Sequence, residues 1–499
     1  MTLAELLRAG AGGPARGPVD VPVRGLRHDS RHVEPGDLFF ALPGSKTDGN
    51  RHAREALEKG AVAVVSELEA PPPPAVVSGT WVRVPDVAET MARMSDLFFG
   101  RPSAGMTVVG VTGTNGKTTT TYMLEAAAAA CGGTVGVIGT VETRLAGERL
   151  AKAVNTTPIS LELNRTLAAM RDGGASHVMM EVSSHALSLK RVETVDFDAA
   201  VFLNLTRDHL DFHKTPEAYF EAKVRLFDLL ARADNVKKVK VAALNADDPK
   251  SHHLRKKAVG CDVVEFGFGE AAKDLRAKVL SSDLDGSRIE WAWRGKRLEG
   301  SIHLPGLYNV SNATAAAAAL LGLGHDPQSL LRGLADLRAV PGRLEAVDEG
   351  QDFHVFVDYA HTDSALETVL ALLKSLPHKN IITVVGCGGD RDKSKRGPMG
   401  VAACRGGDFA VFTSDNPRSE DPAAILTDIE AGVRAAGLKN HTMVPDRGEA
   451  IAAAVARARA GDVVLIAGKG HEDYQILRDR TVPFDDRQAA RSALRSLKK

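Results

Sequence analysis

The segment Gly110-Val-Thr-Gly-Thr-Asn-Gly-Lys-Thr-Thr119 limits the possible folds more than any other part of the chain. It follows an apolar run at Thr107–Val111 and opens a helical stretch. Glycines let the backbone curl until its N–H groups face phosphate oxygens, and the helix N-terminus adds partial positive charge. The pattern therefore predicts a strand, a phosphate-binding loop and a helix, with Lys117 on the β- and γ-phosphates and Thr118 on Mg²⁺.

This loop departs from the common pattern Gly-x-x-x-x-Gly-Lys-Ser/Thr, because position 111 is Val111 and glycines stand at 110 and 113. A tight glycine turn that binds nothing is the alternative. The strand, the Gly-Lys-Thr triplet and the helix together favour a nucleotide site. Its predicted contacts are Gly113, Thr114, Asn115, Gly116, Lys117, Thr118 and Thr119.

Apolar runs alternate with helical stretches along most of the chain, which predicts parallel sheets covered on both faces. Polar or glycine-rich residues follow the runs of the last block, and ligands bind at the carboxyl ends of strands in such sheets. The first block has shorter runs, at Asp37–Leu42 and Ala61–Val65. The later runs are Val135–Ile138, His177–Met180, Ala199–Leu203, Lys240–Leu244, His354–Val357, Ile381–Val385, Phe409–Phe412 and Asp462–Ile466.

The 499 residues predict about three domains, at roughly 150 residues per domain. We expect boundaries that give domains at 1–104, 105–340 and 341–499, with linkers at Gly100–Gly105 and Val340–Arg343. The tract Pro71–Pro74 predicts a loop, because proline lacks a backbone donor. Alanine runs at 126–130 and 315–319 predict helix interiors. The fold class is therefore α/β in three domains, the central one a parallel-sheet, P-loop ATPase-like domain.

Composition excludes several classes of protein. Lys plus Arg equals Asp plus Glu at 63 each, for a formal net charge of +0, whereas binders of nucleic acid or membrane surfaces usually carry a basic excess. The four cysteines lie far apart, which disfavours a zinc site or a disulfide framework. No apolar stretch suits a signal peptide or a membrane span. We expect a cytoplasmic monomer that binds no nucleic acid and does not insert into membranes.

Beyond the phosphate loop, the chain resembles the Mur ligases, which form amide bonds in the synthesis of peptidoglycan precursors. Each motif alone is weak, but their order along nearly the whole chain is specific. They are Thr112–Thr119, Asn155–Pro158, Glu181–His185, Asn204–Asp211, Tyr219–Lys223, Pro341–Arg343, Asp358–His361, Asp415–Arg418 and Gly468–Glu472. The resemblance implies an N-terminal α/β domain for a UDP-linked substrate and a C-terminal Rossmann-like α/β domain for an amino acid.

The resemblance also implies a metal site in the central domain, with Thr118, Glu181, His209 and Lys223 as ligands and Lys117, Glu181, His209 and Lys223 as the catalytic set. Carboxylate and hydroxyl oxygens are ligands that Mg²⁺ prefers. The family's lysine at position 223 is carbamylated, which makes it an anionic oxygen ligand. The pattern alone leaves alternatives open: a helix cap for Glu181, a structural histidine at 209, and a solvated lysine at 223.

Contacts to ATP outside the loop follow from the same resemblance. Asn309 would lie near adenine, Arg343 would reach phosphate and Asp358 would reach ribose. By pattern, an asparagine ahead of the alanine-rich helix is an N-cap instead. The family usually has proline where this chain has Asp363, so the local turn can differ.

The family pattern assigns His28, Ser30, Ser45, Lys46 and Thr47 to the uridine diphosphate. Polar surface loops are an equally good interpretation of these residues. The muramoyl-dipeptide would be held by Asn155, Thr156, Thr157, Ser183 and Arg191. Some members have glutamine where this chain has Leu189, which puts that contact in doubt.

The incoming amino acid is indicated by Asp415, Asn416, Pro417 and Arg418, which resemble the signature of members that add meso-diaminopimelate. That substrate has a second carboxylate, which a guanidinium can bind with two hydrogen bonds. Leaving this arginine unpaired would penalise L-lysine. Arg391 would bind the other carboxylate, Glu472 the ammonium group, and Gly468 would line the site. A surface turn is the alternative for residues 415–418.

The expected reaction joins meso-diaminopimelate to UDP-N-acetylmuramoyl-L-alanyl-D-glutamate through an acyl phosphate made from ATP, with Mg²⁺ neutralising charge. The acyl phosphate must be shielded from water, so we expect the last block to close over it. Three alternatives remain: the same ligation with L-lysine, a ligase of the folylpolyglutamate synthetase type, and a P-loop switch that ligates nothing. Arg418 disfavours ligation of L-lysine. The catalytic set disfavours a switch that ligates nothing.

Overall fold

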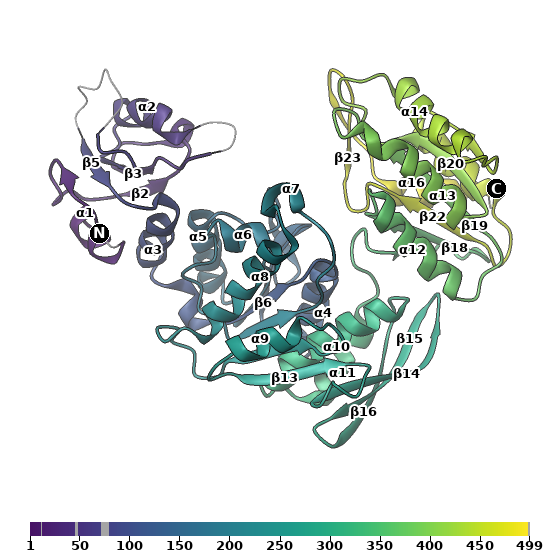
Figure 1. Cartoon of the computed structure of the whole chain (residues 1–499), viewed down its shortest axis with the longest axis horizontal. Coiled ribbons are helices and arrows are strands. Elements are labelled where there is room, and N and C mark those ends of the chain that lie inside the picture. The colour runs from purple at the N-terminus through teal and green to yellow at the C-terminus, as the bar shows by residue number, and fades with distance from the viewer. Residues whose placement is uncertain (11, 45–47, 71–78, 498–499) are drawn as a thin grey trace. The chain divides into compact units, whose positions relative to one another are not determined.

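The computed structural model describes residues 1–10, 12–44, 48–70 and 79–497, and shows an α/β protein (Figure 1). The chain divides into two compact units. The first comprises Met1–Ala277, Trp291–Leu298 and Ser311–Gly333, and the second comprises Lys278–Glu290, Glu299–Val310 and Leu334–Lys499. Ser45–Thr47 and the tract Pro71–Pro74 lie outside the described residues. No helix in the described ranges is long and apolar enough to cross a membrane.

The N-terminal region forms a five-stranded sheet in the order β1-β5-β4-β3-β2. β2 to β5 are parallel and β1 is antiparallel. Apolar side chains pack on both faces of this sheet. The elements are α1 (Leu3–Ala9), β1 (Ala15–Arg16), β2 (Gly25–Arg27), η1 (Ser30–His32), β3 (Asp37–Phe40), η2 (Gly49–His52), α2 (Ala53–Glu58), β4 (Ala63–Ser66), β5 (Thr80–Arg83), α3 (Val87–Phe98) and η3 (Pro102–Gly105).

The central region is built on a sheet whose parallel strands run in the order β14-β13-β12-β11-β6-β10-β7, with β8 and β9 antiparallel at one edge. β6 is flanked by β10 and β11, so the phosphate loop leaves the middle of the sheet. Its first elements are β6 (Thr107–Thr112), α4 (Lys117–Ala130), β7 (Val135–Ile138), β8 (Glu142–Leu145), β9 (Glu148–Lys152), α5 (Ser160–Asp172), β10 (His177–Glu181), α6 (Ser184–Ser188) and β11 (Ala199–Phe202).

The remaining central sequence contains both helices and strands. One face of α8 is apolar, and its residues Phe220, Val224 and Phe227 are buried in the same core as residues of β10 and β11. The elements that follow β11 are α7 (Leu210–His213), α8 (Pro216–Ala231), β12 (Val241–Asn245), α9 (Ser251–Lys257), β13 (Asp262–Gly267), β14 (Leu275–Asp283), β15 (Gly286–Trp293), β16 (Lys296–Ile302), α10 (Leu307–Gly322) and α11 (Pro327–Asp336).

The last region forms a six-stranded sheet in the order β17-β18-β22-β19-β20-β21, parallel except for β17. Apolar clusters cover both of its faces. The elements are β17 (Glu345–Ala346), β18 (His354–Asp358), α12 (Asp363–Ser375), β19 (Ile381–Cys387), η4 (Lys393–Lys395), α13 (Arg396–Gly406), β20 (Phe409–Ser414), α14 (Pro422–Ala435), β21 (His441–Met443), α15 (Arg447–Arg457), β22 (Val463–Ala467), β23 (Tyr474–Ile476), β24 (Thr481–Pro483) and α16 (Asp486–Leu497).

One local expectation needs correction. Asn309 and Asn312 are not N-caps, because α10 begins at Leu307 and both asparagines are buried inside it. Within the Gly100–Gly105 linker, residues Pro102–Gly105 form the 3₁₀ helix η3. Asp363 does not disturb its turn, since it takes the first position of α12 after the N-cap Thr362. That position suits proline, and it also suits a carboxylate facing the positive end of the helix.

Candidate functional site

The phosphate loop joins β6 to α4 as the sequence predicts. Gly116 has a φ of 91°, and a Cβ there would lie 2.4 Å from the side-chain oxygen of Asn312. Only glycine avoids both the left-handed strain and this clash. The Lys117 ammonium group donates to the carbonyls of Gly113 and Thr114 at 2.8 and 2.9 Å. The loop therefore holds its lysine against its own backbone, at the N-terminus of α4.

The segment that follows β11 forms hydrogen bonds with the phosphate loop. The backbone N–H of Asn115 donates to the side chain of Asn204 at 2.9 Å, and Asn204 donates back to the Asn115 carbonyl at 3.1 Å. The Thr114 hydroxyl accepts from the backbone of Thr206 at 3.0 Å. The sequence did not single out Asn204 for a role, although it is the first residue of the motif Asn204–Asp211.

Lys223 is not a solvated lysine, because its side chain is buried in α8 and only 1% of the residue is exposed. Its Nζ donates to the Gly113 carbonyl at 2.9 Å and lies 4.3 Å from the centre of the Tyr219 ring. Burial, with a smaller effect from Lys117, lowers the pKa of Lys223 well below its usual value. Lys223 therefore contacts the phosphate loop, and its buried position disfavours the charged ammonium form.

Glu181 is the last residue of β10 and is almost fully buried. One carboxylate oxygen accepts from the Thr140 backbone at 2.8 Å and the other from the Thr140 hydroxyl at 3.0 Å. Each oxygen retains a second lone pair for another partner. No helix begins at Glu181, since Ser183 is the N-cap of α6, so the helix-cap alternative is wrong. Sequence reasoning missed Thr140.

Four of the five residues predicted for the dipeptide form one hydrogen-bonded network with Glu181. The Thr157 hydroxyl donates to the Glu181 carbonyl at 2.8 Å and accepts from the Ser183 backbone at 3.1 Å. Arg191 donates to the Thr157 carbonyl at 2.8 Å, and burial lowers its pKa. The Thr156 and Thr140 hydroxyls lie 3.1 Å apart. Asn155, just before this network, is exposed.

His209 lies in a group of aromatic rings after β11. Its ring centre is 4.8 Å from that of His185 and 6.0 Å from that of Tyr219, and its Nε2 is 3.5 Å from the Asp208 carboxylate. The backbone of His209 is left-handed, with a φ of 52°. Within the described ranges, no three His, Cys, Asp or Glu side chains form a metal-binding cluster.

His28 and Ser30 have different surroundings in the N-terminal region. His28 lines a cavity of about 580 Å³, its Nδ1 lies 3.8 Å from the Glu162 carboxylate, and burial lowers its pKa. Ser30 is buried and donates to Glu55 at 2.8 Å, outside the lining of that cavity. The structure thus does not bring the two predicted side chains into one pocket.

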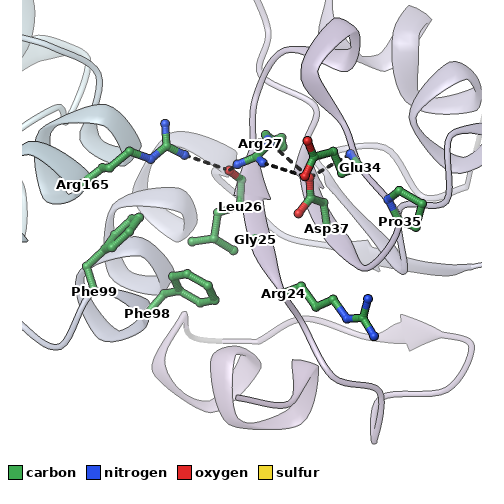
Figure 2. A pocket seen from close by; sticks show the side chains of 10 residues that line it. All are labelled: Arg24, Gly25, Leu26, Arg27, Glu34, Pro35, Asp37, Phe98, Phe99 and Arg165. Carbon is green, nitrogen blue, oxygen red and sulfur yellow. Dashed lines mark hydrogen bonds and ion pairs between the residues drawn. The ribbon is translucent and has the colours of Figure 1, made fainter. Parts of the chain in front are cut away.

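A second cavity of about 570 Å³ shares Arg27, Glu34 and Arg165 with the first (Figure 2). Arg165 donates to the Leu26 carbonyl at 3.2 Å, and Arg27 lies 3.1 Å from the Asp37 carboxylate. Its charged groups are therefore already partly paired. Its lining comprises Arg24, Gly25, Leu26, Arg27, Glu34, Pro35, Asp37, Phe98, Phe99 and Arg165.

In the second unit, Asp415–Arg418 follow β20 directly and do not form a simple exposed turn. Asn416 is buried, donates to Glu472 at 3.0 Å and accepts from the Ile476 backbone at 2.9 Å. Arg418 has a left-handed φ of 52°, and its guanidinium donates to the Gly389 carbonyl at 2.8 Å. This segment is therefore held against two other loops.

The loop after β22 supplies the opposite side of this site. Gly468 lies against Asp415, where a Cβ would be 2.9 Å from the carboxylate. Lys469, which sequence reasoning did not assign, is fully buried and donates to Glu472 at 3.1 Å and to Asn416 at 3.3 Å. Arg391 is exposed in the loop after β19. The site thus combines carboxylate, amide and cationic groups suited to an amino acid.

The remaining predicted ATP contacts, Asn309, Arg343 and Asp358, all belong to the second unit. Asp358 accepts from the backbone of Leu344 and Ala360, both at 2.8 Å, and burial raises its pKa against the opposing effect of Arg343. The guanidinium of Arg343 lies 5.2 Å from the centre of the Tyr359 ring. Asn309 donates to the Pro305 carbonyl at 2.8 Å.

Comparison with protein families covers most of the chain. The description "Mur ligase family, catalytic domain" matches residues 22–99, "Mur ligase middle domain" matches 111–320, and "Mur ligase, glutamate ligase domain" matches 342–470. These three matches, with the three sheets they contain, confirm the predicted three-domain α/β fold. The exact boundaries at 104 and 340 stay predictions.

Among similar proteins is a UDP-N-acetylmuramoyl-L-alanyl-D-glutamate–2,6-diaminopimelate ligase of Solibacter usitatus, 48% identical over 95% of this chain and 94% of its own. A relative of the same name from Geobacillus thermodenitrificans is 47% identical over 94% of each chain. A solved structure with that name superposes with a TM-score of 0.72 and 33% identity, covering 100% of this chain and 99% of its own. A folylpolyglutamate synthase of Thermotoga maritima, with a TM-score of 0.59 and 16% identity over 76% of this chain and 89% of its own, shares the fold alone.

Proposed function

Because this chain belongs to the Mur ligase family, we propose that it joins meso-diaminopimelate to the D-glutamyl residue of UDP-N-acetylmuramoyl-L-alanyl-D-glutamate, using ATP. The relatives that match along nearly their whole length carry the name of this activity. The geometric observation that carries the proposal is the linked group Arg418, Asn416 and Glu472, which offers a guanidinium and a carboxylate to one small zwitterion.

In the first step, the D-glutamyl carboxylate attacks the γ-phosphate of ATP and displaces ADP. Lys117 and the backbone N–H groups of Gly113–Thr119 bind the phosphates, and Arg343 adds positive charge. Thr157, Ser183 and Arg191 orient the carboxylate beside Glu181. In the second step, the amine attacks the acyl phosphate, the amide forms and phosphate leaves. Glu472 holds the ammonium group of the amino acid, and Arg418 and Arg391 hold its carboxylates.

The residues at the end of β10 fit a magnesium ion. Glu181 is a buried carboxylate whose oxygens each retain a free lone pair, and Thr118 offers a hydroxyl at the start of α4. Mg²⁺ bound there would neutralise phosphate charge. Lys223 as a carbamate and His209 complete the proposed donor set. Burial lowers the pKa of Lys223, which supports this assignment because carbon dioxide reacts with the unprotonated form of an amine.

The UDP end of the substrate is assigned to His28, Ser30 and the loop Ser45–Thr47, within the domain proposed at 1–104. Ser30 would have to release Glu55 to bind it. We further propose that the enzyme acts as a monomer in the cytoplasm, where ATP is supplied.

Phosphate release from ATP tests this function against its alternatives. A ligase of this kind requires both the UDP-linked dipeptide and the amino acid for release. Release with a folate and glutamate instead would favour the folylpolyglutamate synthetase type. Phosphate release at the same rate with and without both substrates would favour a nucleotide switch.

A further inference from the structure

A fully buried ion pair joins the first turns of two helices in the last region. Arg447 begins α15 and Asp486 begins α16, and the side chains of both are 0% exposed. The guanidinium donates to the two carboxylate oxygens at 2.7 and 2.6 Å. Because both residues stand at helix N-termini, the helix dipoles favour Asp486 but oppose Arg447. The positive charge of Arg447 therefore lies at the positive end of the α15 dipole, which is unfavourable for a cation.

The same guanidinium also contacts the ends of two strands. It donates to the Ala467 carbonyl at 3.1 Å and to the Ser414 carbonyl at 3.5 Å. Ala467 ends β22 and Ser414 ends β20, and these strands are separated by β19 in the sheet. The next residues are Gly468 and Asp415, where the two segments of the amino-acid site begin. One side chain thus fixes the starting points of both segments.

Stability alone does not explain such a pair. Removing two charges from water is expensive, and apolar residues of similar volume often give a more stable protein. A guanidinium with several fixed donors is well suited to holding separate carbonyls at a set spacing. The Asp415 and Glu472 carboxylates also lie near enough to stabilise its charge. The contacts therefore point to a role in the geometry of the adjoining site.

We propose that Arg447, oriented by Asp486, is a positioning residue that sets the spacing of segments 415–418 and 468–472 and thereby the affinity for the incoming amino acid. The link to affinity rests on the proposed function. The link to the geometry of the two segments does not.

The test uses the double variant Arg447→Met/Asp486→Leu in the full chain, because it leaves no unpaired buried charge. Amide hydrogen exchange should become faster in both segments, while the phosphate loop keeps its exchange rates. In kinetic assays the KM for meso-diaminopimelate should rise about tenfold or more, with the KM for ATP nearly unchanged, since a small displacement of binding groups is costly. Arg447→Lys, which keeps the charge but loses the fork, should give an intermediate KM.

A matched control is Asp462→Asn, at the opposite end of β22. Asp462 is also buried and accepts from the backbone of Asn380 and Arg459 at 3.1 and 2.8 Å. Its loss should leave exchange in the two segments and the KM for meso-diaminopimelate unchanged. Unchanged exchange in the double variant, or equal effects in the control, would overturn the proposal. Faster exchange in both segments, as predicted, in a protein that shows no activity with meso-diaminopimelate would instead refute the proposed function.

Discussion

Among single residues, Lys223 shows most clearly how burial alters chemistry. If it acts as a carbamate, Lys223→Ala should lower kcat by about 100-fold or more, because an anionic metal ligand is lost. Added formate or acetate should restore part of the activity by occupying the space. Phosphate-release assays with and without these carboxylates provide the measurement. The exposed Lys256→Ala serves as control, and absence of rescue would count against the carbamate.

The proposed selectivity for the second carboxylate rests on Arg418. Arg418→Lys keeps a positive charge but loses the planar fork and its hydrogen bond to Gly389. We expect kcat/KM for meso-diaminopimelate to fall about 10- to 100-fold, the range for losing a charge-assisted bidentate contact. The KM for ATP should stay the same. Arg434→Lys on the exposed face of α14 should change neither value. An unchanged kcat/KM for meso-diaminopimelate in Arg418→Lys would refute the assignment of Arg418.

The sequence identified many of these residues by type, but not their partners. Glu181 and Asn416 were predicted from motifs, whereas Thr140 and Lys469 emerge only from three-dimensional contacts. Lys223 shows the reason: a lysine in a helical pattern is normally solvated, and only the packing of α8 beside the phosphate loop reveals its burial. Partners far apart in sequence leave no local signal.

At the level of elements, the strands were the most predictable feature. Near-continuous apolar runs at Val135–Ile138 and Ile381–Val385 became β7 and β19, because strands buried on both faces need apolar residues throughout. The start of α10 was missed, since Leu307 and Tyr308 precede the asparagines that resemble caps. Tertiary packing buried those asparagines inside the helix.

The turn between β6 and α4 depends on glycine at position 116. Gly116→Ala should weaken binding of a non-hydrolysable ATP analogue at least tenfold, because it adds left-handed strain of about 1–2 kcal/mol and a clash with Asn312. Calorimetric titration gives the affinity. Gly174→Ala is a matched control, since Gly174 also has a positive φ of 84° but has nothing within 4 Å of an added Cβ. Equal effects of both variants would contradict this account.

The N-terminal end of β10 makes the first unit sensitive to acid. Burial, aided by the nearby His325, lowers the pKa of His177 to about 4 from its usual 6.5. The folded state thus binds fewer protons than the unfolded state, so this contribution to stability is complete above pH 6.5 and is lost as the pH falls towards 4. After allowance for solvent screening, the loss is about 1–2 kcal/mol.

Urea unfolding at pH 7.5 and pH 5 tests this sensitivity. The protein with His177→Gln should lose less unfolding free energy between the two pH values than the unaltered protein. The exposed His252→Gln should lose as much as the unaltered protein. Equal losses in all three would show that His177 does not control the acid response.

For the whole molecule, three α/β regions divide the work of a three-substrate ligation. The phosphate loop, the Glu181 network and Lys223 lie in the first unit, and the proposed amino-acid site lies in the second. The family matches extend across all three regions. The central claim is therefore that one chain couples ATP cleavage to the addition of a specific diamino acid.

The most direct test compares phosphate release from ATP and UDP-N-acetylmuramoyl-L-alanyl-D-glutamate in the presence of meso-diaminopimelate or L-lysine. We predict release with meso-diaminopimelate and at least about 100-fold less with L-lysine, because lysine lacks the second carboxylate that Arg418 would bind. Equal or greater release with L-lysine would contradict the role of Arg418 and the proposed substrate.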